Sequence, residues 1–247
     1  MVSFATLKER SRKQLKGHLP SAIFVVFLSS LALAVTERFE GSSNTSSLIA
    51  YILLSIFLTA PIYVGKIKFM LDLSLGKNPK ISEILFGFKH FSKSTFLGVI
   101  SLIGSSTILY ISSFLGYIIT STFSGNIFLQ LLVILIGICL FVASYYILVL
   151  FSMSYYVLSY NPDIPITSCI IRGMDLIKGH VLDYLLLGLS FILWFILPIV
   201  LASFLFNIIS IVITLGVIPY ALWLSAYIEM TYINFYLELN NSTIEKE

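Results

Sequence analysis

The chain has 247 residues, of which 58% are hydrophobic and only 11% are charged, with a formal net charge of +3. Roughly a quarter of the residues of a soluble globular domain are charged, so this composition excludes an ordinary soluble domain. Together with a mean hydropathy of +0.98 it indicates an integral membrane protein made of one polytopic domain, residues 1–247.

Uncharged stretches long enough for membrane-spanning helices, which need about 20 apolar residues each, occur at residues 17–36, 41–65, 94–162 and 184–228. The first two stretches hold one span each. The third is interrupted by a turn-forming cluster at 121–126 and therefore holds two. The fourth has room for two around Asn207. The sequence thus predicts an all-α bundle of six spans at 19–36, 47–66, 94–119, 127–158, 184–205 and 208–236.

Basic residues predict the orientation of these spans, because cytoplasmic loops accumulate Lys and Arg. With six spans, every Lys and Arg except Arg38 falls on one side of the membrane. Both termini are therefore expected in the cytoplasm. No basic segment is interleaved with aromatic residues outside the apolar spans, which argues against a nucleic-acid partner.

Short motifs recur at similar places before and within the spans. Lys16-Gly17-His18 precedes the first span, Lys178-Gly179-His180 precedes the fifth, and Lys89-His90 precedes the third. Pro61-Ile62-Tyr63 and Ile218-Pro219-Tyr220 recur in the second and sixth spans. A period of about 80 residues fits these motifs and predicts three repeats, at 3–77, 80–160 and 165–240.

Each predicted repeat consists of a short basic helix, a span, an extracytoplasmic turn and a return span. The repeat also favours a permanent first span over the cleavable signal peptide that Ala32-Leu33-Ala34 after an apolar run imitates. Because the three repeats point the same way, they do not match the inverted halves of a typical secondary transporter.

The short helices are predicted to be amphipathic. Ile81, Ile84, Leu85 and Phe88 follow a helical stripe, which is typical of a helix that lies in the membrane interface with its basic face toward head groups. The alternative is a loop helix packed on the protein. The interfacial interpretation predicts contacts with anionic lipid head groups for Arg12, Lys13, Lys16, Lys89, Lys93 and Lys178.

Ionisable residues that could support chemistry are scarce, and no catalytic, nucleotide-binding or metal-binding motif is present. Asp72 and Glu229 follow the two span prolines at similar distances. We expect both to lie near the short basic helices and to pair there with Lys or Arg, with a proton or cation site as the alternative. His180 and Asp183 share a helical face, where an interfacial hydrogen bond is favoured over a metal or acid/base pair. His18 completes the candidate polar set. We expect neither a metal nor a cofactor.

Tyrosines crowd the return spans toward their predicted cytoplasmic ends. An aromatic belt explains tyrosine at this depth, and a polar, tyrosine-lined cavity is the alternative. Small residues such as Ser29, Ser30, Gly98 and Ser105 would allow close helix approach.

Several motifs together resemble a known family. Asn161-Pro162-Asp163-Ile164-Pro165, Lys178-Gly179-His180, Thr214-Leu215-Gly216-Val217-Ile218-Pro219-Tyr220 and Phe235-Tyr236 occur in the order typical of the bacterial membrane proteins grouped as domain of unknown function 975. The resemblance implies a multi-spanning protein of the bacterial cytoplasmic membrane. It implies no activity.

Two functions are compatible with these observations, and both are non-enzymatic. The first is a membrane accessory or lipid-interacting protein, with anionic lipids and a membrane protein as partners. The alternative is a transporter or permease for a small or amphipathic solute, with a path lined by tyrosine, serine and Glu229. A third possibility, an intramembrane enzyme, would require two or more of His18, His90, His180 and Asp183 to converge within metal-ligand distance. The sequence defines neither a substrate nor an oligomeric state.

Overall fold

The computed structural model describes residues 3–40, 44–121, 127–194, 196 and 210–244, and within these residues it contains helices and no strand. The helices are α1 (Phe4–Leu15), α2 (Leu19–Glu37), α3 (Thr45–Leu54), η1 (Ser55–Thr59), α4 (Ala60–Ser74), η2 (Ile81–Leu85), α5 (Phe86–Lys89), α6 (Phe91–Ser121), α7 (Ile127–Tyr160), α8 (Ile166–Ile177), α9 (Val181–Leu189) and α11 (Ser210–Ile244). The all-helical prediction is therefore confirmed.

Four helical segments are long and apolar enough to cross a membrane: Leu19–Glu37, Thr45–Ser74, Phe91–Ile118 and Ile127–Tyr160. A fifth is obtained if α8 and the helix Val181–Trp194, which meet at a bend of 74°, count as one broken span. The predicted total of six is not reached among the described residues. The predicted sixth span, 208–236, overlaps α11. Of the turn predicted at 121–126, Ser121 is the last residue of α6, and residues 122–126 lie outside the described residues, as does Asn207.

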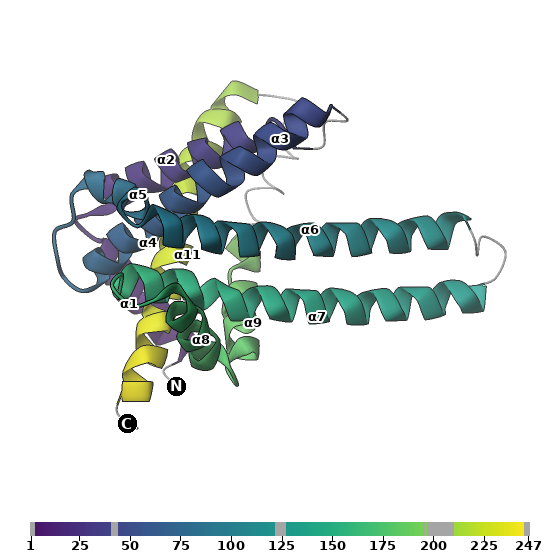
Figure 1. Cartoon of the computed structure of the whole chain (residues 1–247). Coiled ribbons are helices and arrows are strands. Elements are labelled where there is room, and N and C mark those ends of the chain that lie inside the picture. The colour runs from purple at the N-terminus through teal and green to yellow at the C-terminus, as the bar shows by residue number, and fades with distance from the viewer. Residues whose placement is uncertain (1–2, 41–43, 122–126, 195, 197–209, 245–247) are drawn as a thin grey trace.

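Helices α6 and α7 form a long hairpin that projects beyond the cluster formed by the other helices (Figure 1). Their outer parts expose large apolar side chains, such as Tyr110 (76% exposed), Phe114 (64%) and Ile127 (75%). Such a surface is unfavourable in water and favourable against lipid tails.

The helical segment that contains the predicted second span is longer than that span. Helices α3, η1 and α4 form one helical segment, Thr45–Ser74, in place of a span that ends at 66. Within it, η1 is a π-helical turn in which the Ala60 N–H bonds to the Ser55 carbonyl. Pro61 follows, and because proline has no N–H to donate, a local change in hydrogen bonding is expected there.

Helix α4 lies at the centre of the structure and contacts α1, α2, α6, α7 and α11. Its side chains Ile67, Phe69 and Met70 are fully buried. The charged residues of α4 were expected to end the span, but the helix continues past them. It can do so because other helices cover it on several sides.

Two glycines bring α4 directly against the segment formed by η2 and α5. A Cβ atom at Gly65 would lie 1.9 Å from the Ile84 carbonyl oxygen, and one at Gly87 would lie 2.0 Å from the Pro61 carbonyl oxygen. Backbone therefore contacts backbone at both places, which only glycine permits.

The three short helices bury part of their surface on the protein. Leu7, Ser11 and Leu15 of α1 are buried, and α1 contacts α11 and α4. Ile84 of η2 is buried against α4, whereas Ile81 and Leu85 remain exposed. In α8 the buried set is Cys169, Gly173, Leu176 and Ile177. These contacts are those of the alternative interpretation, in which the short helices pack on protein.

The two Lys-Gly-His motifs adopt the same backbone conformation. Gly17 and Gly179 have φ angles of 94° and 87°, which glycine tolerates and other residues rarely adopt. His18 and His180 then precede α2 and α9 with φ/ψ of −116°/8° and −119°/13°. This similarity agrees with the predicted repeat, which stays a prediction.

Replacing either contact glycine by alanine should destabilise the fold, because the added methyl group would meet a backbone that cannot move aside. We expect Gly65→Ala and Gly87→Ala each to lower the free energy of unfolding by at least about 2 kcal/mol. Thermal unfolding of the purified protein in detergent would measure the loss. Gly116→Ala is the matched control, since its Cβ would meet no atom within 4 Å. Equal stability of all three variants would contradict the packing described here.

Candidate functional site

An ion pair joins two helices inside the cluster. The Nζ atom of Lys66 on α4 lies 2.7 Å from Oε2 of Glu229 on α11, and the two side chains are only 14% and 12% exposed. Charges removed from water to this extent are costly unless they are paired. The pair therefore fixes the position of α4 relative to α11.

Tyrosines surround this ion pair. The Tyr156 hydroxyl donates a weak hydrogen bond of 3.4 Å to Oε1 of Glu229. The Lys66 ammonium lies 4.5 Å from the centre of the Tyr63 ring, within the range of a cation–π interaction. Tyr63 in turn packs edge-on against Tyr155. Both charges thus have aromatic or hydroxyl neighbours in addition to each other.

A cavity of about 700 Å³ opens beside the ion pair, and both Lys66 and Glu229 belong to its wall. The wall comes from α2, α3, η1, α4, α6, α7 and α11. Its hydroxyl-bearing residues are Ser29, Ser30, Tyr51, Ser55, Thr59, Tyr63, Ser101, Ser105, Ser152, Tyr155 and Ser225. This cavity matches only part of the polar, tyrosine-lined one that the sequence left as an alternative, because Tyr155 lies in its wall with Tyr51 and Tyr63 while most of the wall surface is apolar.

The chemistry of this cavity is that of a binding site for a small molecule. Its volume falls within the range of about 300 to 1,000 Å³ typical of ligand pockets. The hydroxyl groups can donate and accept hydrogen bonds, and the apolar residues between them, such as Val26, Leu33 and Leu148, can contact a hydrocarbon part. The two wall charges neutralise each other, so the lining favours a neutral, zwitterionic or amphipathic ligand over a multiply charged one.

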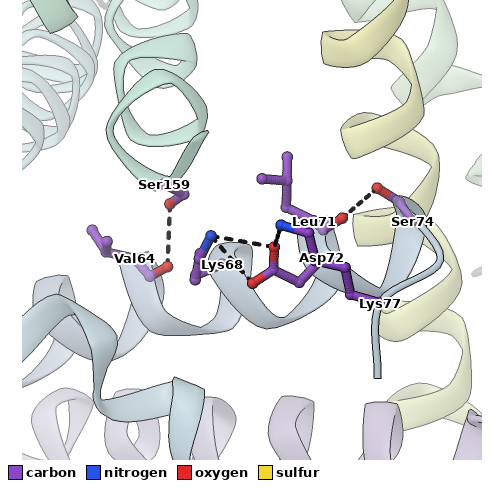
Figure 2. Close-up of polar contacts among 7 residues, drawn as sticks. All are labelled: Val64, Lys68, Leu71, Asp72, Ser74, Lys77 and Ser159. Atoms are coloured by element: carbon purple, nitrogen blue, oxygen red, sulfur yellow. Dashed lines mark hydrogen bonds and ion pairs between the residues drawn. The ribbon is translucent and has the colours of Figure 1, made fainter. Parts of the chain in front are cut away.

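Asp72 lies in a second charged cluster at the end of α4. Its carboxylate lies 3.1 Å from Nζ of Lys68 and 2.9 Å from Nζ of Lys77. Figure 2 shows the two lysines converging on Asp72. In the same view, the Ser159 hydroxyl of α7 donates to the Val64 carbonyl one helical turn before Lys68. Asp72 and Glu229 are thus each paired with lysine, but the lysines belong to α4 and the loop after it, not to the short basic helices.

The candidate histidines lie at the starts of helices. His180 Nδ1 and Asp183 Oδ2 are 3.0 Å apart, and both side chains are about 40% exposed, at 42% and 38%. The backbone carbonyl of His18 accepts hydrogen bonds from the Ser21 hydroxyl and the Ala22 N–H. No group of three or more His, Cys, Asp and Glu residues that could hold a metal ion occurs in the part of the chain that the structure describes.

The residues predicted to contact lipid head groups differ in whether their side chains already have partners in the protein. Lys16, Lys89 and Lys178 are exposed. Lys93 instead donates hydrogen bonds to the carbonyls of Pro162 and Ile164, in the loop after α7. Lys13 pairs with Glu9 at 2.8 Å on the surface of α1. Arg12 contacts the aromatic residues Tyr227 and Trp194.

Lys66 is the site residue that sequence analysis missed. It stands at the end of an apolar stretch, where a basic residue is ordinarily explained by topology. Two features of the sequence could have revealed it. Lys66 lies five residues after Pro61 in the same helix as Asp72, and Glu229, at the end of the last apolar stretch, is a carboxylate that could pair with it.

Removing one charge of the Lys66–Glu229 pair should cost more than removing both. We expect Glu229→Gln to lower the free energy of unfolding by about 3 kcal/mol, because it leaves the Lys66 ammonium unpaired. The double variant Lys66→Met/Glu229→Gln should lie within about 1 kcal/mol of the parent protein, since no charge then remains to be desolvated.

Thermal unfolding in detergent would measure both variants. Glu238→Gln on the same helix is the control, because Glu238 is 4.0 Å from Arg10 and more exposed, so its pair should contribute less than about 1 kcal/mol. A double variant as unstable as Glu229→Gln would show that the pair is not the stabilising unit.

Comparison with known proteins identifies the family. The family described as "Protein of unknown function (DUF975)" matches residues 1–243. Neither a comparison with curated proteins nor one with solved structures gives a match. Because the match covers almost the whole sequence, the chain belongs to the DUF975 family, as its motifs indicated.

Proposed function

We propose that this chain is a polytopic protein of the bacterial cytoplasmic membrane that moves a small or amphipathic solute through the cavity beside Lys66 and Glu229. Both termini are placed in the cytoplasm on the basis of the distribution of Lys and Arg. The cavity of about 700 Å³ with the ion pair in its wall is the observation that supports this function over a purely accessory role.

The composition of the cavity wall supports the same function. Serine hydroxyls in such a wall can bond to their own helix, as those of Ser29, Ser105 and Ser152 do. The charged side chains Lys66 and Glu229 carry more weight, because charged groups within a bilayer are costly and usually functional. Here α2, α6, α7 and α11 all contribute serine to one cavity. A solute with a polar head and a short apolar part would satisfy both kinds of wall residue.

A lipid-interacting accessory role is the second candidate. It is favoured by Lys89 and Lys178, which are exposed and lie just before the starts of α6 and α9. Exposed lysines at this position attract anionic head groups by about 1 kcal/mol each. Such binding is diffuse and requires no cavity.

We propose a non-enzymatic role in either case. His180 and Asp183 meet each other across one helical turn, which gives two polar groups with no third described His, Cys, Asp or Glu beside them. The hydroxyls of the cavity also have ordinary partners, as in the 2.9 Å contact between Ser101 Oγ and the Tyr155 hydroxyl.

Transport through the cavity requires that its wall be reachable from both sides of the membrane. In a Cys139→Ser/Cys169→Ala background, Ser101→Cys should react with a membrane-impermeant trimethylammonium methanethiosulfonate. We expect reaction when the reagent is added to intact cells and when it is added to inverted membrane vesicles, because a transporter exposes its central site alternately.

Two controls define the result. Ser159→Cys should stay unreactive from both sides, because Ser159 is fully buried between α7 and α4. Adding Glu229→Gln should change the ratio of the two rates, whereas adding Glu238→Gln should not. Labelling of Ser101→Cys from one side only, or from neither, would reject transport and leave the accessory role.

A further inference from the structure

Three basic residues lie on one face at the N-terminal helix. Lys8, Arg12 and Lys16 follow each other at four-residue intervals in α1 and its C-cap, so they occupy successive turns of the same face. This face looks toward α11 and the segment after α9: the Lys8 ammonium donates to the Ser190 carbonyl at 2.9 Å and lies 4.0 Å from the centre of the Phe191 ring.

Arg12 is held by aromatic residues. Its Nε donates to the Tyr227 hydroxyl at 3.1 Å. Its guanidinium carbon lies 5.4 Å from the Tyr227 ring centre and 5.9 Å from that of Trp194. Trp223 stacks on Tyr227 at 5.6 Å. The hydrogen bond and the rings fix the guanidinium in place and leave its remaining N–H donors for another acceptor.

Among the residues described, Lys8, Arg12 and Lys16 lack the carboxylate partners that the other basic residues of α1 have. Lys13 pairs with Glu9, and Arg10 lies 4.0 Å from Glu238. No carboxylate of the described residues lies within 4.0 Å of Lys8, Arg12 or Lys16. Burial lowers the pKa of Lys8, and the nearby charge of Arg12 lowers that pKa further.

A second cavity, of about 250 Å³, opens at the C-terminal end of this face of α1. Its lining residues are Arg12, Leu15, Lys16, Gly17, Leu19, Trp223 and Tyr227. It is separate from the large cavity and shares no lining residue with it. Two basic side chains in a lining that is otherwise apolar and aromatic match a ligand with an anionic end joined to a hydrocarbon part.

We propose that this second cavity binds the head group of an anionic phospholipid, with the phosphate oxygens against Arg12 and Lys16. Arginine is well suited to phosphate because its N–H groups can bind two oxygens at once. Trp223 and Leu19 contact the glycerol and the first acyl carbons, since tryptophan favours the interface between head groups and tails. The apolar helix α2 begins at Leu19 and gives the acyl chain a continuous apolar path, which a soluble phosphate would not require. This proposal depends on neither function proposed above.

The site contains its own fluorescent reporters. The chain has two tryptophans, Trp194 and Trp223, and their rings lie 5.8 Å apart in this cluster. The full chain is reconstituted in phosphatidylcholine nanodiscs that contain a fixed fraction of phosphatidylglycerol. Bromine is placed on the acyl chains of either lipid, because bromine quenches tryptophan fluorescence at close range.

We expect brominated phosphatidylglycerol to quench more strongly than brominated phosphatidylcholine at equal mole fraction. Each cation contributes about fivefold to head-group binding, so Arg12→Gln/Lys16→Gln should lower the preference more than about tenfold. Lys13→Gln is the control matched to the single variant Lys16→Gln, because each removes one positive charge from α1 or its C-cap, and Lys13 lies outside the cavity lining, so it should keep the preference.

Three results would overturn the proposal. One is equal quenching by the two brominated lipids, and another is an equal preference in the double variant and in Lys13→Gln. The third is loss of the preference when inorganic phosphate replaces chloride at constant ionic strength, which would assign the cavity to a soluble anion. If the double variant fails to fold, Lys16→Gln alone provides the test, since the Lys16 side chain is exposed and about fivefold is expected.

Discussion

The pairing of charges along α4 is the constraint on which the rest of the structure depends. Most residues of this helix from Val64 to Leu73 are buried, yet it carries Asp72, which is buried, and Lys66 and Lys68, which are partly buried. Each charge has an opposite partner within 3.2 Å, in Glu229, Lys77 or the same helix. A charge left without its partner here would carry the desolvation cost alone and destabilise α4 at the centre of the bundle, where the helix helps to line the cavity.

Side-chain to side-chain and side-chain to backbone hydrogen bonds then place α1 between α11 and α4. The Asn234 amide of α11 donates to the Ser11 hydroxyl at 2.9 Å and to the Gln14 side-chain oxygen at 2.7 Å. The Gln14 amide donates to the Ser74 carbonyl at the end of α4. Because these groups are buried or partly buried, breaking one contact leaves another polar group without a partner. The network thus sets the rotation of α1, and with it the direction in which Arg12 points.

Sequence reasoning predicted the parts of this fold that follow from hydrophobicity and local motifs. Uncharged runs located α2, α6 and α7 to within a few residues, and the Lys-Gly-His motif marked two turns of matching conformation. It placed the end of the second span at residue 66, because a lysine after an apolar run ordinarily marks the interface. Whether such a lysine is instead buried depends on the partner carboxylate, and Glu229 is 163 residues away in the chain. For the same reason the sequence alone did not distinguish tyrosines and serines of an aromatic belt from those that line a cavity. That distinction depends on which helices lie side by side.

Helix α11 carries both candidate sites within two residues of each other. Tyr227 is fully buried and faces Arg12 at the smaller cavity, whereas Glu229 faces Lys66 at the larger one. Residues two apart on a helix point about 200° apart, so the two sites lie on opposite faces of the same turn. A rotation of α11 that strengthened one set of contacts would therefore weaken the other. The helix is held at a rotation that satisfies both, by Arg12 from one side and by Lys66 from the other.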